Sequence, residues 1–136
     1  MNRITHFEIQ ADDLARAAKF YTDVFGWEIK KWDSPAMEYW MVMTAPQDSK
    51  EPGINGGMHK RPVPLAEGQC GCNAFVCTMV VENYDATAEK ILAAGGKVAM
   101  PKFDIADMAW QGYFIDTEGN TFGIHEVKPK ANSSQI

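Results

Sequence analysis

Cysteine is scarce in this chain, with three residues of that type among 136. Cys70, Cys72 and Cys77 are an odd number, so the sequence does not predict a disulfide framework and favours a reducing compartment. Cys70 and Cys72 also lack the second cysteine pair that a structural zinc site needs, which leaves them as free thiols in a loop. We interpret Cys77, which lies in an apolar segment, as a small core residue.

The chain also has fewer basic than acidic residues and lacks long apolar runs. The formal net charge is -5, from 13 Lys and Arg against 18 Asp and Glu, which disfavours binding to nucleic acid phosphates or anionic lipid. No apolar run is long enough to span a bilayer, and the first residues enter a strand-like pattern without the apolar core of a signal peptide. We therefore expect a cytoplasmic protein with neither nucleic acid nor membrane partners.

Three further motifs are missing: a phosphate-binding loop, a nucleophile elbow and an HExxH pattern. What the chain does contain is ordinary for one globular domain, since 46% of its residues are hydrophobic and 23% are charged. Aromatic residues reach 11%, which indicates an aromatic-rich core or pocket.

The first half of the chain predicts one helix among four strands. Asp12 or Asp13 is placed to cap a helix whose apolar stripe ends at Phe25, and Gly26 is a natural stop. The mixed pattern before the helix is typical of a strand, and further strand-like segments follow it. The predicted strands are 4–10, 27–32, 39–44 and a short segment at 56–59.

The second half repeats this order. Asn83 is the predicted cap, and Gly95 and Gly96 end the helix. A shift of 70 residues places Gly26 on Gly96 and Asp13 on Asn83. The predicted strands of this half are 74–81, 97–100, 110–116 and 121–127, with a turn at 116–120.

This duplication predicts an α+β fold made of two tandem β-α-β-β-β units. One unit is too small to cover both faces of its sheet, so we expect the two to share a concave, mostly antiparallel sheet with the helices outside. The units run over residues 4–59 and 73–127 within a single domain of residues 1–136. A linker is expected at 61–71 and a polar, frayed tail at 128–136.

Three local motifs support the same fold in order along the chain. They are Phe20–Trp27, in which an aromatic pair precedes a glycine, Ala93–Val98, its partner in the second unit, and the final hairpin Phe114–Phe122. Together with the duplicated unit, they resemble the vicinal oxygen chelate family, the group of glyoxalases, bleomycin-resistance proteins and extradiol dioxygenases. The resemblance covers roughly residues 4–127. Proteins with this fold catalyse many different reactions, so the resemblance predicts the fold but does not by itself identify a reaction.

The resemblance also implies four positions for a divalent metal, one on the first and last strand of each unit. His6 matches the first of them. The repeat places Val76, Gly57 and Gly123 at the other three, and none of these side chains can donate to a metal. We therefore expect no cofactor at the usual catalytic metal site.

A second interpretation uses three histidines. His59 and His125 lie two residues beyond the two glycines, on the same face of their strands, and could join His6. A two-residue step moves a side chain roughly 6.6 Å along a strand, which places them away from the family's site unless a bulge intervenes. In the alternative interpretation, the three histidines line a pocket or its rim.

The predicted function is binding of a small organic ligand in a pocket between the units, by a glyoxalase- and bleomycin-resistance-like protein. The alternative is a metal-dependent lyase, isomerase or dioxygenase of the vicinal oxygen chelate type, in which the metal acts as a Lewis acid. A homodimer is expected because the family often pairs. The residues predicted to contact the ligand are His6, Trp40, Met58, His59, Trp110, Tyr113, Phe122 and His125.

Overall fold

The computed structural model describes residues 3–33, 35, 37–65 and 75–130. The chain divides into two compact units. The first holds the described residues up to 65 together with Thr117–Asn120, and the second holds the described residues 75–116 and 121–130. Cys70, Cys72 and most of the predicted linker lie outside the described residues.

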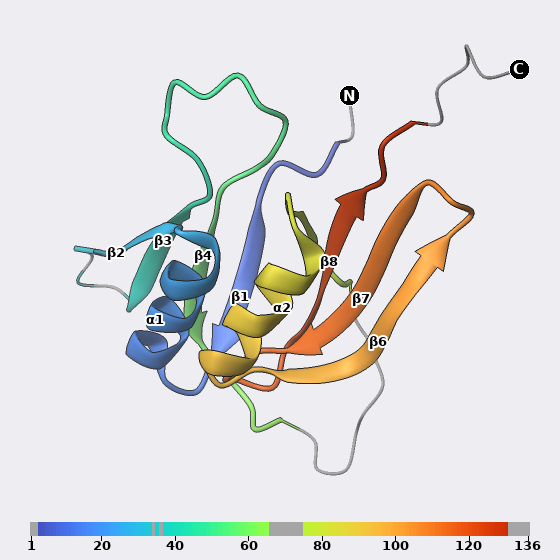
Figure 1. Ribbon diagram of the computed structural model, residues 1–136. Helices are drawn as coiled ribbons and strands as arrows, with labels where there is room; N and C mark the ends of the chain where they lie inside the picture. Colours follow the sequence, from blue (N-terminus) through green and yellow to red (C-terminus); the bar gives the residue numbers. More distant parts are fainter. Residues whose placement is uncertain (1–2, 34, 36, 66–74, 131–136) are drawn as a thin grey trace, which may run out of the picture. The chain divides into compact units, whose positions relative to one another are not determined.

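The first unit is a four-stranded sheet with one helix (Figure 1). Its strands lie in the order β1-β4-β3-β2. β1 and β4 are parallel, and the other two neighbours are antiparallel. The elements are β1 (Phe7–Ala11), α1 (Leu14–Phe25), β2 (Glu28–Trp32), β3 (Tyr39–Met43) and β4 (Gly56–Lys60).

Helix α1 begins and ends where its sequence predicts. The Asp13 side chain accepts a hydrogen bond of 3.0 Å from the Arg16 backbone N–H, which makes it the N-cap. Gly26 follows the helix with a φ of 72°, and its N–H donates to the Thr22 carbonyl. The buried stripe packs against the sheet, and it consists of Leu14, Ala17, Phe20, Tyr21 and Val24.

The second unit repeats this plan. Its strands lie in the order β5-β8-β7-β6, again with one parallel pair, β5 and β8. Asn83 caps α2 by accepting from the Ala86 backbone N–H at 2.9 Å. The elements are β5 (Thr78–Val80), α2 (Tyr84–Ala93), β6 (Lys97–Ile105), β7 (Ala109–Ile115) and β8 (Thr121–Val127).

The strand register is equivalent in the two units. Glu8 pairs with Gly57 across β1 and β4, and Thr78 pairs with Gly123 across β5 and β8. Glu8 and Thr78 are related by the predicted 70-residue shift, while the two glycines are 66 residues apart. The structure thus confirms the α+β class and the tandem β-α-β-β-β units.

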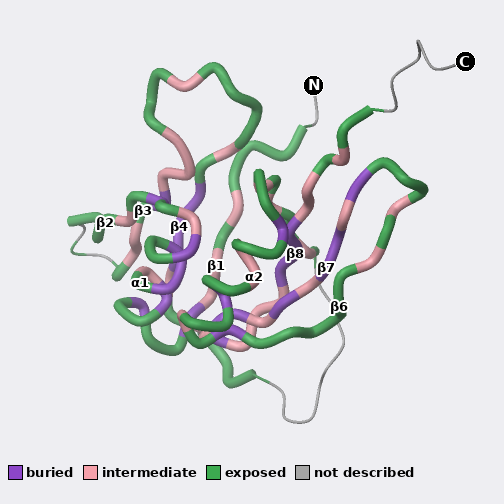
Figure 2. Tube along the Cα trace, in the orientation of Figure 1, coloured by how far each residue is buried: buried purple, intermediate pink, exposed green. Residues whose placement is uncertain are grey.

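Each sheet has one face packed in the core of its unit. Val42 and Met58 are 0% exposed in the first unit, and Phe122 and Ile124 are 2% and 0% exposed in the second. Figure 2 shows in purple the buried stretches of the chain. Side chains alternate along a strand, so the residues next to these point to the opposite face. We call that opposite face of each sheet the open face, because the largest buried side chains of its strands lie on the other side.

Some predicted boundaries were wrong. β1 begins at Phe7 and not at residue 4, and β5 has only three residues in place of the predicted 74–81. β6 continues to Ile105, beyond the predicted end at residue 100. β6 is longer than predicted because its pairing with β7 continues to Ile105, past register shifts on either side of Met100.

Two residues differ from their predicted setting. Cys77 precedes the short strand β5 and is exposed, so it is not a core residue. Lys128, the first residue of the tail that was predicted to be frayed, is held in place. Its Nζ contacts Asp104 Oδ1 at 2.7 Å and lies 4.0 Å from the ring centre of Trp110. Within the described residues, neither helix is long and apolar enough to cross a membrane.

Candidate functional site

Tyr39 is the centre of a polar cluster on the open face of the first unit. Its phenol end lies directly over Gly57, where any Cβ would overlap the ring. The phenol oxygen lies 2.8 Å from His6 Nε2. The Tyr39 ring is also nearly parallel to that of His59, its neighbour on β4, with ring centres 6.3 Å apart and planes 12° apart.

Glu8 adds a carboxylate to this cluster. It pairs with Gly57, so its side chain emerges beside the phenol that crosses the glycine. Its Oε2 lies 3.9 Å from His59 Nε2, and the two side chains are 48% and 21% exposed. Partial burial and then the Glu8 carboxylate raise the pKa of Tyr39, which therefore keeps its proton at neutral pH.

The second unit carries an equivalent arrangement without a carboxylate. Gln111 occupies the register position of Tyr39, since each pairs with the histidine of the last strand, His125 or His59. His125 Nδ1 donates to Gln111 Oε1 at 2.7 Å, and Gln111 Nε2 donates to Thr78 Oγ1 at 3.3 Å. A Cβ at Gly123 would overlap the Gln111 amide and the Thr78 hydroxyl.

These arrangements decide whether the residues fit a metal at the positions that the family resemblance implies. Gly57 and Gly123 offer no donor atom, and the space above them is taken by Tyr39 and Gln111. His6 Nε2 is engaged with Tyr39. The described part of the chain contains no group of three or more His, Cys, Asp or Glu residues placed to hold a metal ion. The residues present do not fit that metal site.

Four of the predicted ligand contacts lie on the other face of their sheets. Met58 and Phe122 are buried in the cores of their units. Trp110 lies beneath two ammonium groups, with Lys102 Nζ 4.4 Å and Lys128 Nζ 4.0 Å from its ring centre. Trp40 shares its face with Val42 and Met58, and its Nε1 donates to Glu38. The candidate site therefore does not include these four residues.

The other four lie on the open faces. His6 and His59 belong to the cluster of the first unit. His125 belongs to that of the second unit, and Tyr113 lies beside Gly123, with its ring stacked 6.4 Å from that of Phe103. The structure thus brings two predicted residues together in each unit.

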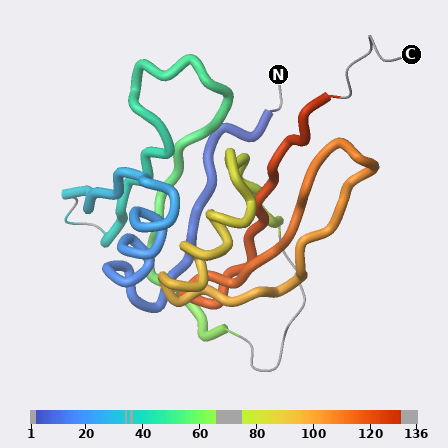
Figure 3. The backbone as a smooth tube through the Cα atoms, viewed as in Figure 1, coloured from blue at the N-terminus to red at the C-terminus, as the bar shows by residue number. Residues whose placement is uncertain are grey.

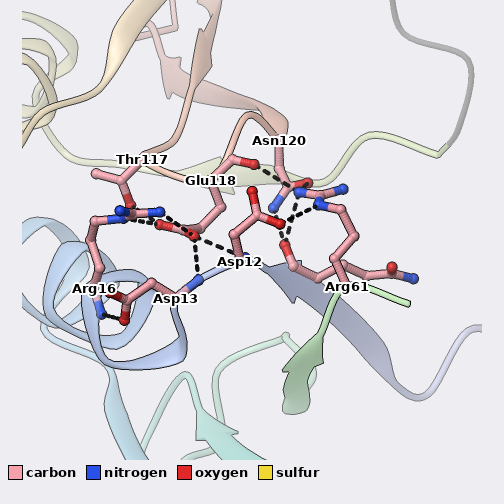
Figure 4. Close-up of polar contacts among 8 residues, drawn as sticks. Asp12, Asp13, Arg16, Arg61, Thr117, Glu118 and Asn120 are labelled. Carbon is pink, nitrogen blue, oxygen red and sulfur yellow. Dashed lines mark hydrogen bonds and ion pairs between the residues drawn. The ribbon is translucent and has the colours of Figure 1, made fainter. Parts of the chain in front are cut away.

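A second polar cluster surrounds Glu118 in the first unit (Figure 4). The Glu118 side chain is 0% exposed and accepts from Arg16 Nε at 2.7 Å. It also accepts from the backbone N–H groups of Asp12 and Asp13, at 3.0 and 2.9 Å. Arg61 Nη2 donates to the Glu118 carbonyl at 2.7 Å, so the turn at 117–120 is held from both sides.

Glu118 adds a buried negative charge at the start of α1 beside the N-cap Asp13, since the first turn of this helix contains no acidic residue. Burial alone would raise the pKa of Glu118, but hydrogen bonds from Arg16, the Asp13 backbone and Thr117 outweigh it and lower the pKa. All donors around the carboxylate belong to the protein, and we interpret this cluster as structural.

Sequence reasoning missed Glu8, Tyr39, Thr78 and Gln111 as site residues. Glu8 could have been found, because it lies two residues after His6 and therefore on the same face of the first strand. Tyr39 and Gln111 could not, since their role depends on the register of the third strand of each unit and on rings or amides crossing a glycine.

Several known proteins are similar to this chain in sequence or in fold. Residues 3–45 match the family described as bleomycin resistance protein-like N-terminal. A glyoxylase-like domain-containing protein of Didymella fabae is 31% identical over 135 residues, covering 90% of this chain and 91% of that protein. The CFP32 protein of Mycobacterium tuberculosis is 29% identical over 122 residues, which are 88% of this chain. The chain spans only 44% of the length of that relative.

A solved structure agrees at the level of the fold. The E126Q variant of the fosfomycin resistance protein FosX of Listeria monocytogenes, complexed with Mn(II) and 1S,2S-dihydroxypropylphosphonic acid, has a TM-score of 0.67 and 17% identity. The match covers 94% of this chain and 92% of that one. From the duplicated units, the matching family and the full-length relative, the chain belongs to the glyoxalase and bleomycin-resistance group of the vicinal oxygen chelate superfamily.

Proposed function

We propose that this protein binds a small organic ligand on the open face of its first unit, without the family's usual divalent metal. The contacts would come from His6, Glu8, Tyr39 and His59. One observation carries the proposal. The family resemblance assigns a metal ligand to residue 57, but this residue is a glycine and the Tyr39 phenol fills the space above it. Tyr39 therefore provides a hydrogen-bonding group at this position.

The chemistry of these groups suits binding. Glu8 is a partly exposed acceptor, and Tyr39 offers a hydroxyl that keeps its proton. The two histidines can donate or accept according to tautomer. A few convergent polar groups beside aromatic rings are the usual composition of a small-molecule site.

The alternative function is a metal-dependent lyase, isomerase or dioxygenase. FosX, which shares the fold, has been crystallised with Mn(II). The donor set of this chain argues against the same use, because a single imidazole does not compensate for the dehydration of a divalent ion. His125 and Tyr113 would form a second contact surface in the other unit.

Two further proposals come from the family and from composition. We propose that the chain forms a homodimer and acts in the cytoplasm. Light scattering at high micromolar protein concentration tests the first of these. A monomer under those conditions would contradict it.

A thermal-shift screen tests the binding proposal. The purified chain is heated with a chemically diverse set of small organic compounds, once with a chelator and once with Mn²⁺, Zn²⁺ or Ni²⁺. We expect at least one compound to raise the melting temperature equally in both conditions, and Glu8→Gln to reduce that rise. Glu51→Gln, at an exposed loop position, is the matched control. A response that requires metal would support the alternative enzyme.

A further inference from the structure

We infer that Gln111 is a positioning residue for His125. Its carboxamide holds the imidazole in the Nδ1–H form, so that Nε2 accepts a hydrogen bond from an N–H or O–H group of a ligand. This inference concerns the second unit and does not depend on the ligand proposed for the first. It follows from which atoms around the imidazole can donate a hydrogen bond and which can only accept one.

The carboxamide of Gln111 is held in place on both sides. The residue is 4% exposed, and its amide lies over Gly123, where a Cβ would overlap it. Gln111 Nε2 donates to Thr78 Oγ1 at 3.3 Å, on β5, the strand beyond β8. An unpartnered end of a buried amide costs free energy. The amide nitrogen therefore stays with Thr78, and the amide oxygen faces His125.

The carboxamide oxygen decides which ring nitrogen of His125 carries the proton. Gln111 Oε1 lies 2.7 Å from His125 Nδ1. A carboxamide oxygen has lone pairs and no proton, so Nδ1 is the donor of this hydrogen bond. In a neutral imidazole, a proton on Nδ1 leaves Nε2 as the acceptor. The opposite tautomer would place the lone pairs of Nδ1 and Oε1 against each other.

The Nε2 atom of His125 is left open to a ligand. No residue in the described ranges donates to it or accepts from it. Arg61 Nε is the only buried side-chain nitrogen or oxygen without a hydrogen-bond partner among those residues, so the unpartnered Nε2 is not a buried atom. Its lone pair therefore reaches the surface of the second unit with its direction fixed by Gln111.

The first unit lacks this device, although its strands have the same register. Tyr39 occupies the position of Gln111. Its hydroxyl can both donate and accept, so the contact of 2.8 Å with His6 Nε2 is compatible with either tautomer. His59, the counterpart of His125, stacks on the Tyr39 ring. The two units thus provide matched positions, of which only Gln111 is a carboxamide.

A fixed acceptor selects the group that a ligand can bring. A ligand N–H or O–H can donate to Nε2 of His125, whereas a carbonyl or ether oxygen would oppose its lone pair to that of the ring. Tyr113, which pairs with Gly123 two residues before His125, adds an aromatic ring on the same face of the sheet. The second unit therefore favours a ligand with a hydrogen-bond donor attached to an apolar ring.

The first test determines the tautomer. The chain contains three histidines, so a long-range ¹H–¹⁵N correlation spectrum of the labelled protein resolves each ring at a pH where imidazole is neutral. We expect the Nδ1–H form of His125 to exceed the Nε2–H form by about tenfold or more, the ratio that one hydrogen bond of ordinary net strength produces. Free histidine in water prefers the Nε2–H form.

Variants show whether Gln111 is responsible. Gln111→Leu removes the acceptor, and we expect the Nε2–H form of His125 to become the major one. Gln111→Glu keeps an acceptor oxygen and should keep the Nδ1–H form. Thr78→Val removes the partner of the amide nitrogen and should lower the tautomer ratio. Tyr39→Leu, the change at the equivalent position of the first unit, should leave the spectrum of His125 unchanged.

The second test measures the acceptor with indole and 1-methylindole, two probes that differ in one N–H group. Dissociation constants are taken from the shifts of the His125 ring signals during titration. We expect indole to bind about three- to tenfold more tightly than 1-methylindole, the range for one net hydrogen bond. In Gln111→Leu the ratio should fall to about one, because Nε2 then carries a proton.

Two results would overturn the tautomer assignment. One is a major Nε2–H form of His125 in the native protein, which would mean that the Gln111 amide is turned over. The other is an unchanged tautomer in Gln111→Leu. If indole binds no more tightly than 1-methylindole, or does not bind, the acceptor role is wrong even where the tautomer is right. Should Gln111→Leu fail to fold, Gln111→Glu and Thr78→Val still decide the tautomer question.

Discussion

The phenol of Tyr39 lies over Gly57, and the carboxamide of Gln111 lies over Gly123 in the same relationship. In both units, the third strand sends a long polar side chain across a glycine of the last strand toward the first strand. The glycine and the side chain that covers it therefore form a pair, and neither can be replaced independently. A side chain restored at residue 57 would have to displace Tyr39.

Gly57→Ala should destabilise the protein by about 1–3 kcal/mol, the range for overpacking a filled site. The new methyl group overlaps the Tyr39 phenol, so the ring must move away from His6. Urea unfolding measures the change. Gly53→Ala is the control, because nothing lies within 4 Å of a Cβ there, and it should be nearly neutral. Equal stability of the two variants would contradict the packing described here.

Glu118→Gln should cost about 2 kcal/mol, as expected when a buried, charge-assisted hydrogen bond is lost. The amide oxygen can keep the Asp12 and Asp13 N–H groups that Oε1 accepts, but its NH₂ group, a donor, then replaces Oε2 opposite Arg16 Nε, and the negative charge is lost. The free energy of unfolding in urea measures the loss. Glu89→Gln, on the exposed face of α2, should change little. A similar effect of the two changes would contradict the role of the cluster.

The same residue predicts a dependence on pH. The pKa of Glu118 is lower in the folded chain than its ordinary value of 4.5, so its carboxylate stabilises the fold above that value. This contribution is lost as the pH falls through the folded pKa. The difference in unfolding free energy between the native protein and Glu118→Gln should therefore be largest near pH 7 and shrink in acid. A difference that grows on acidification would contradict the pKa direction.

Ala106→Asn should stabilise the chain by about 0.5–1 kcal/mol. Ala106 and Asp107 have φ values of 47° and 59°, the left-handed values that a type I′ turn needs at both central positions. Asparagine adopts this region more readily than alanine. Thermal unfolding measures the gain. Ala86→Asn, in the exposed first turn of α2, should instead be slightly destabilising because of helix propensity.

The fold was predictable because local signals agree with it in both halves. Asp13 and Asn83 cap their helices as their side chains and spacing indicate, and Gly26 ends the first helix in the left-handed region. The lengths of β5 and β6 were not predictable. They depend on pairing with β8 and β7, which no local pattern encodes.

The site was predictable only in part, for a similar reason. Alternation along the first strand places His6 and Glu8 on one face, and the repeat aligns His59 with His125. Trp40 and Met58 look equally suitable as ligand contacts in the sequence. Only the register of the sheet shows that they share the packed face with Val42, whereas Tyr39 lies on the open one.

The last prediction concerns metal content. Protein purified without chelator or metal-affinity resin should carry no stoichiometric divalent ion at the family's usual site, before or after dialysis against zinc, nickel or manganese. The reason is the donor count, since His6 supplies one nitrogen while Gly57, Val76 and Gly123 supply none. Elemental analysis measures the content, and His6→Ala should leave it at the same low level.

This prediction would be contradicted if the protein held about one tightly bound ion per chain and lost it in His6→Ala. That result would support the metal-dependent enzyme instead. Loss in His59→Ala or His125→Ala as well would identify the three-histidine set as the site. In the structure His6 Nε2 lies against Tyr39 and His125 Nδ1 donates to Gln111, so each of these rings has its other nitrogen left for an ion. The described residues bring no group of three or more His, Cys, Asp or Glu donors together, which is why we expect the metal content to stay low.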